Sequence, residues 1–398
     1  MLRTPRRRRM ATAALVLGML FTIPAVASAR SNDIGVASSH DGVRLNQIQV
    51  VGSHNSYHVE ATPAEKAIRI QLSPATETEL EFTAAPINEQ LGAQHVRQVE
   101  FDVFADPDGG LYATPMLREL AGEGPYDPAM RQPGTKVLHA QDADYHTRCL
   151  TLVACLRQVK DWSDRNRGHL AIAIMLEFND APLTVPGDPT PVPGTVIPLP
   201  WTRDRMLALE REILSVFSRD RLITPDSVRR PGMTLEQSVL ASGWPTVEQT
   251  RGKVMFLMDQ KGFVTTYRDA YVQGNPSLEG RLMFTQSQPG QPDGAFMKRY
   301  VWDAGGPEQI TDLVRRGYMV RTRADHDTLE ARANDPAHRD TALASGAQWV
   351  STDYPAPGMA DRFGSPYFVA IPGGTVARCN PIVLVSGCDS AALEPARR

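Results

Sequence analysis

Short, almost wholly apolar runs constrain the fold of this 398-residue chain more than any other feature of its sequence. The clearest are "HLAIAIMLEF" at 169–178 and "GKVMFLMD" at 252–259. A strand with apolar side chains on both faces is typical of a parallel sheet that helices cover. Stretches of helical length lie between these runs, so the pattern predicts an α/β fold.

Eight strands and at least five helices are predicted. We expect strands at 46–52, 95–104, 136–140, 169–178, 253–259, 281–286, 317–324 and 347–353, and helices at 151–166, 202–218, 234–241, 307–316 and 337–345. Eight strands that alternate with helices predict an irregular (β/α)8 barrel of the TIM type in a single domain. Active sites of such barrels lie at the carboxyl ends of the strands, so polar residues that close apolar runs are the candidates for chemistry.

The proline-rich stretch at 181–200, "APLTVPGDPTPVPGTVIPLP", is a candidate linker. Its prolines predict an extended loop, and such insertions decorate a domain as often as they divide one. We interpret it as a loop on one domain that covers residues 30–398.

The first 29 residues predict export. A basic stretch, an apolar stretch and the small residues "ASA" before a cleavage site after Ala29 are typical of a secretory signal peptide. Cleavage removes five arginines and no acids, which moves the formal net charge from −3 to −8. An acidic mature chain argues against a nucleic-acid partner. No later segment is long and apolar enough to span a membrane, so we expect the mature chain to be soluble. We also expect it to be secreted and monomeric.

Four cysteines lie in the exported part of the chain. Cys149 and Cys155 are close in sequence, as are Cys379 and Cys388. Three pairings are possible, and an oxidising destination favours two local disulfides over a metal site, which prefers tighter Cys-x-x-Cys spacing. The second pair would staple the C-terminal tail.

Three carboxylates close apolar runs. Glu100 and Asp102 in "QVEFDVF" are two residues apart, so a strand places both on one face, where they are costly without a cation. Glu177 is the first charge after the run at 170–176, and Asn55 adds a neutral oxygen after the first strand. An all-oxygen set favours Ca²⁺ or Mg²⁺, and an extracellular setting favours Ca²⁺. Solvated strand faces and ends are the alternative interpretation.

Two histidines also close strands. His54 ends the first and His139, in "KVLHA", ends the third. A single histidine at such a place is more often structural, but two that flank a carboxylate pair favour acid and base catalysis at one phosphorus. The remaining histidines, His58 among them, lack this placement and are left out of the predicted chemistry.

The segments "GSHNSYH", "VEFDV", "KVLHA" and "IMLEFND", in this order, resemble the catalytic half of the phosphatidylinositol-specific phospholipase C superfamily, in particular its secreted actinobacterial calcium-dependent branch. The resemblance covers residues 46 to 180 most clearly and extends to "QWVSTDYP". The metal-free bacterial branch is similar but has an arginine where this chain has acids.

The resemblance implies that His54 and His139 are the catalytic pair, and that Asn55, Glu100, Asp102 and Glu177 hold Ca²⁺. It implies cleavage of phosphatidylinositol-type lipids to diacylglycerol and inositol 1,2-cyclic phosphate, which water opens in a second step. His54 is assigned as base and His139 as acid. The expected partner is a phosphoinositide or related phosphodiester, met in transient contact with a membrane surface.

Four further residues are candidates for substrate binding. Arg321 and Arg323 share a strand face in "MVRTRAD" and pair with either the metal-site carboxylates or an anionic substrate. In "STDYP", Asp353 is a candidate acceptor for inositol hydroxyls and Tyr354 a candidate for stacking on the sugar ring, although a turn before Pro355 accounts for both residues equally well.

Two other functions stay open. A glycerophosphodiester phosphodiesterase of the same barrel group shares a Glu-x-Asp strand and a later histidine. A secreted protein that binds phosphoinositol or glycans without turnover is the second, against which the intact histidine pair argues.

Overall fold

The computed structural model describes residues 42–185, 187–260, 266–383 and 385–394. The predicted signal peptide at 1–29 lies outside the described residues.

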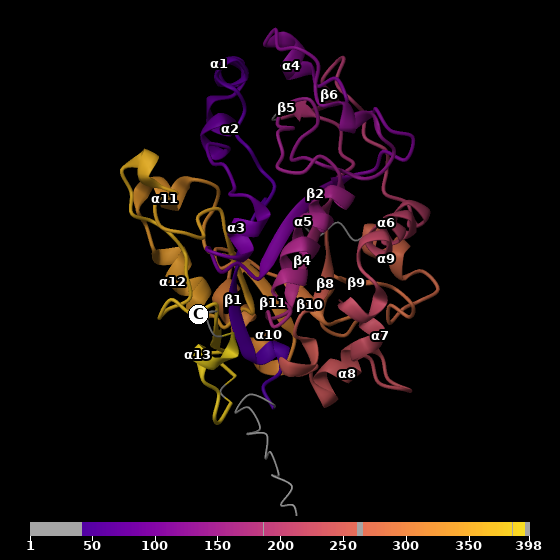
Figure 1. Cartoon of the computed structure of the whole chain (residues 1–398), viewed down its shortest axis with the longest axis vertical. Helices are drawn as coiled ribbons and strands as arrows, with labels where there is room; N and C mark the ends of the chain where they lie inside the picture. Colours follow the sequence, from indigo (N-terminus) through magenta and orange to yellow (C-terminus); the bar gives the residue numbers. More distant parts are fainter. Residues whose placement is uncertain (1–41, 186, 261–265, 384, 395–398) are drawn as a thin grey trace, which may run out of the picture. The chain divides into compact units, whose positions relative to one another are not determined.

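A ring of parallel strands forms the centre of the fold (Figure 1). Its members, in ring order, are β1 (Ile48–Ser53), β2 (Gln98–Phe104), β4 (Ile172–Phe178), β8 (Val254–Gln260), β9 (Met283–Thr285), β10 (Phe296–Lys298), β11 (Met319–Arg323) and β12 (Trp349–Thr352). β12 pairs with β1, and one bridge between Gln286 and Phe296 links β9 to β10, so the ring closes. The prediction of an irregular TIM-type barrel is confirmed.

Helices connect and cover these strands. The longer ones are α1 (Pro63–Leu72), α5 (Leu152–Arg165), α6 (Arg203–Val216), α8 (Leu235–Ser242), α10 (Gly306–Arg316) and α12 (Ala337–Ala344). The shorter ones are α2 (Pro74–Glu79), α3 (Ile87–Leu91), α4 (Met116–Leu120), α7 (Pro225–Val228), α9 (Thr266–Val272), α11 (Leu329–Ala333) and α13 (Ser390–Leu393). All five predicted helices are present within two residues of their expected ends. In the described part of the chain, no helix is both long and apolar enough to cross a bilayer.

One predicted barrel strand is wrong. The run at 136–140 forms only β3 (Lys136–Val137), which pairs antiparallel with the end of β2 and so stays outside the ring. The eighth member is β10 instead, which pairs in parallel with β11. Three residues are too few to show a periodic pattern, so the sequence did not indicate this strand.

Several short strands lie outside the ring, and some bear on the predictions for the loop and the tail. The proline-rich segment contains a hairpin, β5 (Thr184–Val185) and β6 (Asp188–Pro191), rather than an extended loop throughout. Its strands are exposed, where a missing proline N–H costs no hydrogen bond. β13 (Ala377–Cys379) adds to β1, and β7 (Leu222–Ile223) extends the sheet beside β8.

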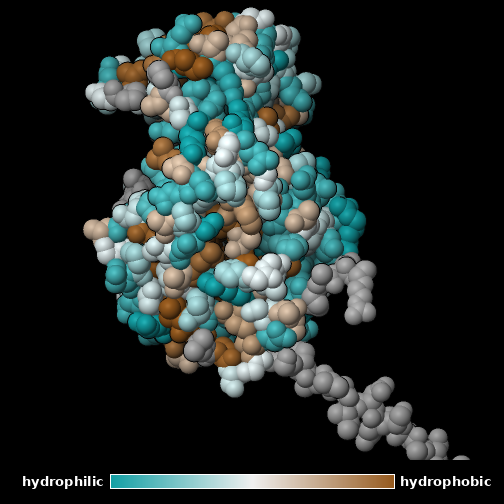
Figure 2. Space-filling view, turned by 90° about the vertical axis from the view of Figure 1, so that its left-hand side faces the viewer, coloured by the Kyte–Doolittle hydropathy of each residue, from teal (hydrophilic) through white to brown (hydrophobic). Residues whose placement is uncertain are grey.

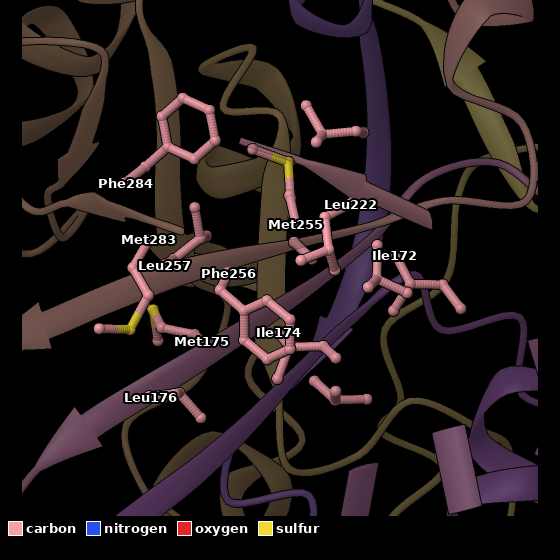
Figure 3. Packing of buried hydrophobic residues seen from close by; sticks show 14 of the residues in the cluster. Ile172, Ile174, Met175, Leu176, Leu222, Met255, Phe256, Leu257, Met283 and Phe284 are labelled. Carbon is pink, nitrogen blue, oxygen red and sulfur yellow. The ribbon is translucent and has the colours of Figure 1, made fainter. Parts of the chain in front are cut away.

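β4 and β8 are buried on both faces, as their apolar runs predict. Ile174 and Met175 point to opposite sides of β4, and neither side chain is accessible to solvent (Figure 3). Phe256 pairs with Ile174 across the β4–β8 ladder. Such a strand packs inside the barrel on one face and against helices on the other.

Gly52 explains why small residues lead into His54. On the neighbouring strand Gln98 lies in register with Gly52, and a Cβ at residue 52 would lie 2.0 Å from its side-chain oxygen. That oxygen accepts a hydrogen bond from Ser351 of β12. Gln98 therefore fills the barrel interior where residue 52 would place a side chain.

Both predicted local disulfides are present. Cys149 pairs with Cys155 at the start of α5, and Cys379 pairs with Cys388 in the C-terminal tail. The second bond joins β13 to the segment that leads into α13.

Replacing Ile174 or Met175 with alanine should lower the free energy of unfolding by about 2–5 kcal/mol in each case, because both faces of β4 are buried. Leu240→Ala on α8 is the control, since its side chain is 43% exposed, and should change stability by less than about 0.5 kcal/mol. Urea unfolding measures all three. A small effect at one of the two β4 positions would contradict burial on both faces.

Candidate active site

Three carboxylates lie side by side at one level of the barrel. Asp102 on β2 is in register with Glu177 on β4, which is in register with Asp259 on β8. Glu100 lies two residues before Asp102 on the same face of β2. Oxygens of Glu100, Asp102 and Glu177 all lie within 4.8 Å of one another. The parallel register of three strands thus gathers the acids that the sequence places far apart.

Two buried cations balance part of this charge. The Arg321 guanidinium donates to Glu100 Oε2 at 2.6 Å, and Lys298 Nζ donates to Asp259 Oδ2 at 2.6 Å. Burial nevertheless raises the pKa of the Glu100 carboxyl to about 7, and the charges of Asp259 and Glu177 add to the rise. Carboxylates this close repel one another, so a bound cation would stabilise their ionised forms.

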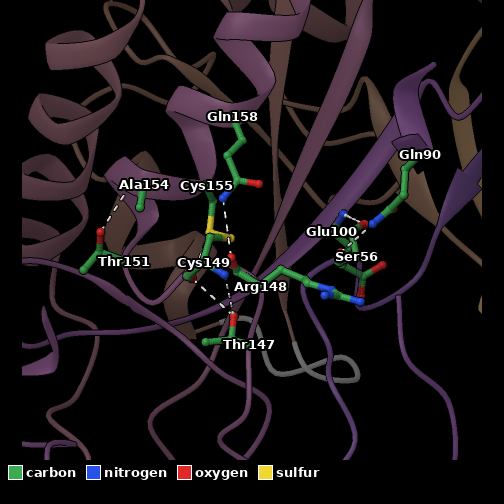
Figure 4. The surroundings of a disulfide bond; sticks show 10 residues. All are labelled: Ser56, Gln90, Glu100, Thr147, Arg148, Cys149, Thr151, Ala154, Cys155 and Gln158. Atoms are coloured by element: carbon green, nitrogen blue, oxygen red, sulfur yellow. Dashed lines mark hydrogen bonds between the residues drawn. A yellow bond between two sulfur atoms is a disulfide. The ribbon is translucent and has the colours of Figure 1, made fainter. Parts of the chain in front are cut away.

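Asn55 follows β1, and its neighbour Ser56 joins this turn to β2. The Ser56 N–H donates to the Glu100 carbonyl at 3.1 Å, and Ser56 Oγ accepts from the Glu100 N–H at 2.8 Å (Figure 4). Asn55 is buried and has a φ of 41°, a left-handed conformation that asparagine tolerates better than most residues. The turn after β1 is therefore fastened to the strand that carries two of the acids.

The donor set fits a calcium ion. Three carboxylates from neighbouring strands offer hard oxygen atoms, and the predicted fourth donor, Asn55, carries a neutral amide oxygen that accepts from Tyr57 at 3.4 Å. Among the described residues, the ligand atoms of this close group are all carboxylate oxygens. Such a set suits Ca²⁺ better than zinc or copper.

His54 is held by a carboxylate and an arginine. Its Nδ1 lies 2.9 Å from Asp353 Oδ1, and its Nε2 lies 3.3 Å from Arg323 Nη1. Arginine only donates, so Nε2 accepts and the imidazole proton lies on Nδ1, where it is donated to Asp353. Burial lowers the pKa of His54 well below its usual value, and the charges of Arg323 and Arg321 add to this effect. The ring is therefore neutral near pH 7, with the Nε2 lone pair directed to the Arg323 side.

Asp353 is fixed on its other side as well. Arg323 Nη2 donates to Asp353 Oδ2 at 3.1 Å. Burial raises the pKa of Asp353, and the Arg323 charge opposes the rise. The Asp353 N–H donates to Asp325 at 3.3 Å, which completes a buried network behind His54.

His139 is held by a second carboxylate. Its Nδ1 lies 2.9 Å from Asp144 Oδ2, and the same oxygen lies 2.9 Å from Nε2 of His58. The other Asp144 oxygen accepts from Arg69 at 2.8 Å. The His139 side chain is 32% exposed, whereas Asp144 and His58 are buried. Asp144 holds the Nδ1 side of the His139 ring in the interior, so the Nε2 side is the one that faces solvent.

The contact between Asp144 and His58 shifts the pKa values of both groups. His58 Nδ1 lies 2.9 Å from the Phe82 carbonyl, which can only accept. Burial lowers the pKa of His58, but the charge and hydrogen bond of Asp144 outweigh this effect and raise it. Burial likewise raises the pKa of Asp144, but the charge of His58 and the hydrogen bonds of both histidines hold it well below its usual value. The carboxylate therefore stays ionised.

One segment links the two histidine systems. It starts at His54 and ends with His58, which forms a β-bridge with Thr147. Beside this bridge, the Tyr57 carbonyl accepts from the Arg148 N–H at 2.7 Å. The Cys149–Cys155 disulfide fastens the same loop to α5 (Figure 4). The chain that carries Asp144 is thus tied both to the turn after β1 and to a helix.

The structure brings most predicted site residues together and places one elsewhere. Arg321 and Arg323 pair with Glu100 and Asp353, as the ion-network alternative describes. Tyr354 is 1% exposed and packs edge to face against Tyr367 in a hydrophobic cluster, so its ring offers no open face to a sugar.

Four neighbours of the site were missed in the sequence: Asp144, His58, Asp259 and Lys298. Asp144 lies in "QDADYH", five residues after His139, and Asp259 closes the apolar run at 254–258. The strand-end rule alone was sufficient to indicate Asp259. His58 and Lys298 carry no comparable signal, because their partners come from distant segments.

Residues 43–381 match the family described as phosphoinositide phospholipase C, Ca²⁺-dependent. No curated protein sequence matches the chain. Among solved structures, the chain is similar to the calcium-dependent phosphoinositol-specific phospholipase C of a Gram-negative bacterium, Pseudomonas sp., with a TM-score of 0.50 and 16% identity over 86% of this chain and 96% of that chain. For a Ca²⁺-dependent phosphatidylinositol-specific phospholipase C from Streptomyces antibioticus the TM-score is 0.48, with 15% identity over 81% and 98% of the two chains. The first similarity supports the barrel fold.

Asp144→Asn should lower the pKa of His58 below about 6.5, because burial then acts without the carboxylate charge. NMR titration of the imidazole measures this shift. In the wild type the folded pKa exceeds the unfolded value, so the stabilising contribution of His58 is complete below about pH 6.5 and is lost as the pH rises through the folded pKa. In the variant the folded pKa of His58 lies below the unfolded value, so His58 destabilises the folded state most at low pH. The difference in unfolding free energy between the wild type and the variant should therefore shrink as the pH rises.

Asp142→Asn is the matched control, because the Asp142 carboxylate accepts hydrogen bonds from the backbone N–H groups of Met116 and Val196 and contacts neither histidine in the described part of the chain. Its His58 should keep the raised pKa. A raised His58 pKa that persists in Asp144→Asn would contradict the shared-carboxylate interpretation.

Proposed function

We propose that this chain, which belongs to the Ca²⁺-dependent phosphoinositide phospholipase C family, cleaves phosphatidylinositol-type lipids to diacylglycerol and inositol 1,2-cyclic phosphate. Family membership makes it a phosphoric diester hydrolase that depends on Ca²⁺. The observation that carries the finer proposal is the cluster of carboxylate oxygens with two aspartate-held imidazoles near it: His54 Nε2 lies 3.9 Å from Glu100 Oε1, and His139 follows Leu138, whose N–H donates to the Asp102 carbonyl.

The four oxygen donors would hold the metal. These are Asn55, Glu100, Asp102 and Glu177, with Arg321 fixing the second oxygen of Glu100. Bound there, Ca²⁺ lowers the pKa of a substrate hydroxyl and offsets charge that develops on the phosphoryl oxygens.

His54 acts as the general base. Its low pKa keeps it neutral, and its Nε2 accepts the proton of the inositol 2-hydroxyl in place of the long bond from Arg323. Asp353 accepts from Nδ1 throughout, so it keeps the ring in the reactive tautomer and stabilises the imidazolium that forms. The freed hydroxyl oxygen then attacks phosphorus in line.

His139 acts as the general acid. Its Nδ1 donates to Asp144, so its proton for the leaving diacylglycerol oxygen comes from Nε2 on the exposed side of the ring. Asp144 stays ionised beside His58 and Arg69, and as an acceptor it keeps the Nδ1 proton of His139 in place and so fixes the orientation of the ring. The product is the cyclic phosphate, which the same two histidines open with water by exchanging roles.

The setting is also part of the proposal. The predicted signal peptide and the two disulfides support a secreted enzyme. A lipid substrate requires transient contact with a membrane surface, and we expect the enzyme to act as a monomer.

Replacing His54 or His139 with alanine should each reduce cleavage of phosphatidylinositol by about 10²–10⁴-fold, because each removes one proton transfer. Phosphorus NMR of the products measures the rate and identifies the cyclic phosphate. His338→Ala is the control, since this histidine lies on α12 and pairs with Glu330 away from the site.

Two outcomes would overturn the proposed reaction. Release of glycerol 3-phosphate from deacylated lipid, without cyclic phosphate, would indicate a glycerophosphodiester phosphodiesterase. A double variant of His54 and His139 that matches the wild type would indicate a binding protein.

Asp102→Asn should weaken calcium binding by at least about 10-fold, because it removes one negative ligand from the cluster. Calorimetry measures the affinity, and a chelator should abolish lipid cleavage by the wild type. Asp108→Asn is the matched control, because Asp108 is exposed on the turn after β2. Activity that survives the chelator would contradict the metal assignment.

A further inference from the structure

A mainly apolar groove opens beside the His139 loop. Its volume is about 430 Å³, which is within the range of about 300–1,000 Å³ typical of small-molecule pockets. The walls come from α1, α4 and the segment of the β5–β6 hairpin, and they include Leu72, Met116, Leu120 and Leu183. Figure 1 shows these three elements at the same end of the barrel.

The floor of the groove belongs to the candidate active site. Asp142 and Ala143 line it, and the next residue is Asp144, which holds His139. In the proposed reaction His139 protonates the oxygen that carries the diacylglycerol. The groove is thus next to the loop that, in the proposed reaction, handles the leaving group.

The charged groups that line the groove already have partners. Asp142 accepts from the backbone of Met116 and Val196, and Arg69 pairs with Glu77 and Asp144. Among the described residues, the exception is Arg69 Nη2, which is buried without a hydrogen-bond partner, so a polar ligand would gain little beyond this one group. An apolar ligand would cover side chains that otherwise face water.

Large apolar side chains are exposed at the rim. Leu72 ends α1 and is 75% exposed, and Leu120 ends α4 and is 62% exposed. Figure 2 shows apolar surface at this end of the molecule among hydrophilic surroundings. Exposed apolar side chains that gather around a groove mark a binding site more often than scattered ones do.

We propose that this groove binds one acyl chain of the lipid that is being cleaved. The inference rests on the proposed function, since it assigns the groove to the tail of the same substrate. Each methylene moved from water into such a groove favours binding by about fourfold. The groove thus orients the leaving group toward His139 and raises specificity for acylated over deacylated substrates.

Kinetics with two substrates test the proposal. Dihexanoyl phosphatidylinositol below its critical micelle concentration has acyl chains, and inositol 1,2-cyclic phosphate has none. Leu72→Asn with Leu120→Asn should lower kcat/KM for the first by about 10-fold or more and leave hydrolysis of the second unchanged. Folding should be retained, because both side chains are exposed.

Ile70→Asn with Ile197→Asn is the matched control. Both side chains are exposed, at 50% and 55%, and neither lines the groove. An equal loss in this control would overturn the proposal in favour of general contact with a bilayer, and so would unchanged kinetics in the groove variant.

Binding of cis-parinaric acid, a fluorescent fatty acid, separates this inference from the reaction. The wild type and the Ile70 and Ile197 variant should bind it saturably, and the Leu72 and Leu120 variant should bind it at least about 10-fold more weakly. Equal binding by all three proteins would overturn the groove assignment. Failure of the wild type to cleave either substrate would instead overturn the proposed function, whatever the binding result.

Discussion

The burial of charge at the carboxyl end of a closed barrel is the constraint on which the rest of the structure depends. Parallel register places Asp102, Glu177 and Asp259 on neighbouring strands at one level, and it places Lys298 beside Arg321 further round the ring. Burying like charges is costly unless opposite charges lie close. Two cations from the protein reduce this cost, and a divalent ion among the acids would reduce it further.

Both imidazoles also lie in networks where buried charges have opposite charges close by. A buried carboxylate holds each of them, and a cation holds each carboxylate in turn: Arg323 for Asp353 and Arg69 for Asp144. The environments differ beyond this shared plan. His54 is 16% exposed beside two arginines, and burial and their charges keep its pKa low, whereas His139 is 32% exposed next to an ionised aspartate. In the proposed reaction, these different surroundings accompany opposite directions of proton transfer.

Prediction from the sequence was correct where a pattern among neighbouring residues determines burial and side-chain direction. The apolar runs at 172–176 and 254–258 indicated strands buried on both faces, and the alternation in "VEFDV" indicated that Glu100 and Asp102 share a face. It failed where the cause lies in distant segments. β10 has only three residues, and Tyr354, adjacent to Asp353, turns into the core because the chain bends after β12.

The sequence by itself determined the class of fold, the strand ends that carry the chemistry and the choice of oxygen ligands, because periodicity and residue type act over a few neighbours. Only the tertiary structure decided which groups meet. Asp144 holds both His58 and His139, and Lys298 of β10 meets Asp259 of β8 past the intervening β9. Ring closure and loop packing bring these partners together, although His58 and Asp144 are 86 residues apart in sequence and Asp259 and Lys298 are 39 apart. The groove beside His139 has the same origin, since α1, α4 and the proline-rich hairpin converge there only in the folded chain.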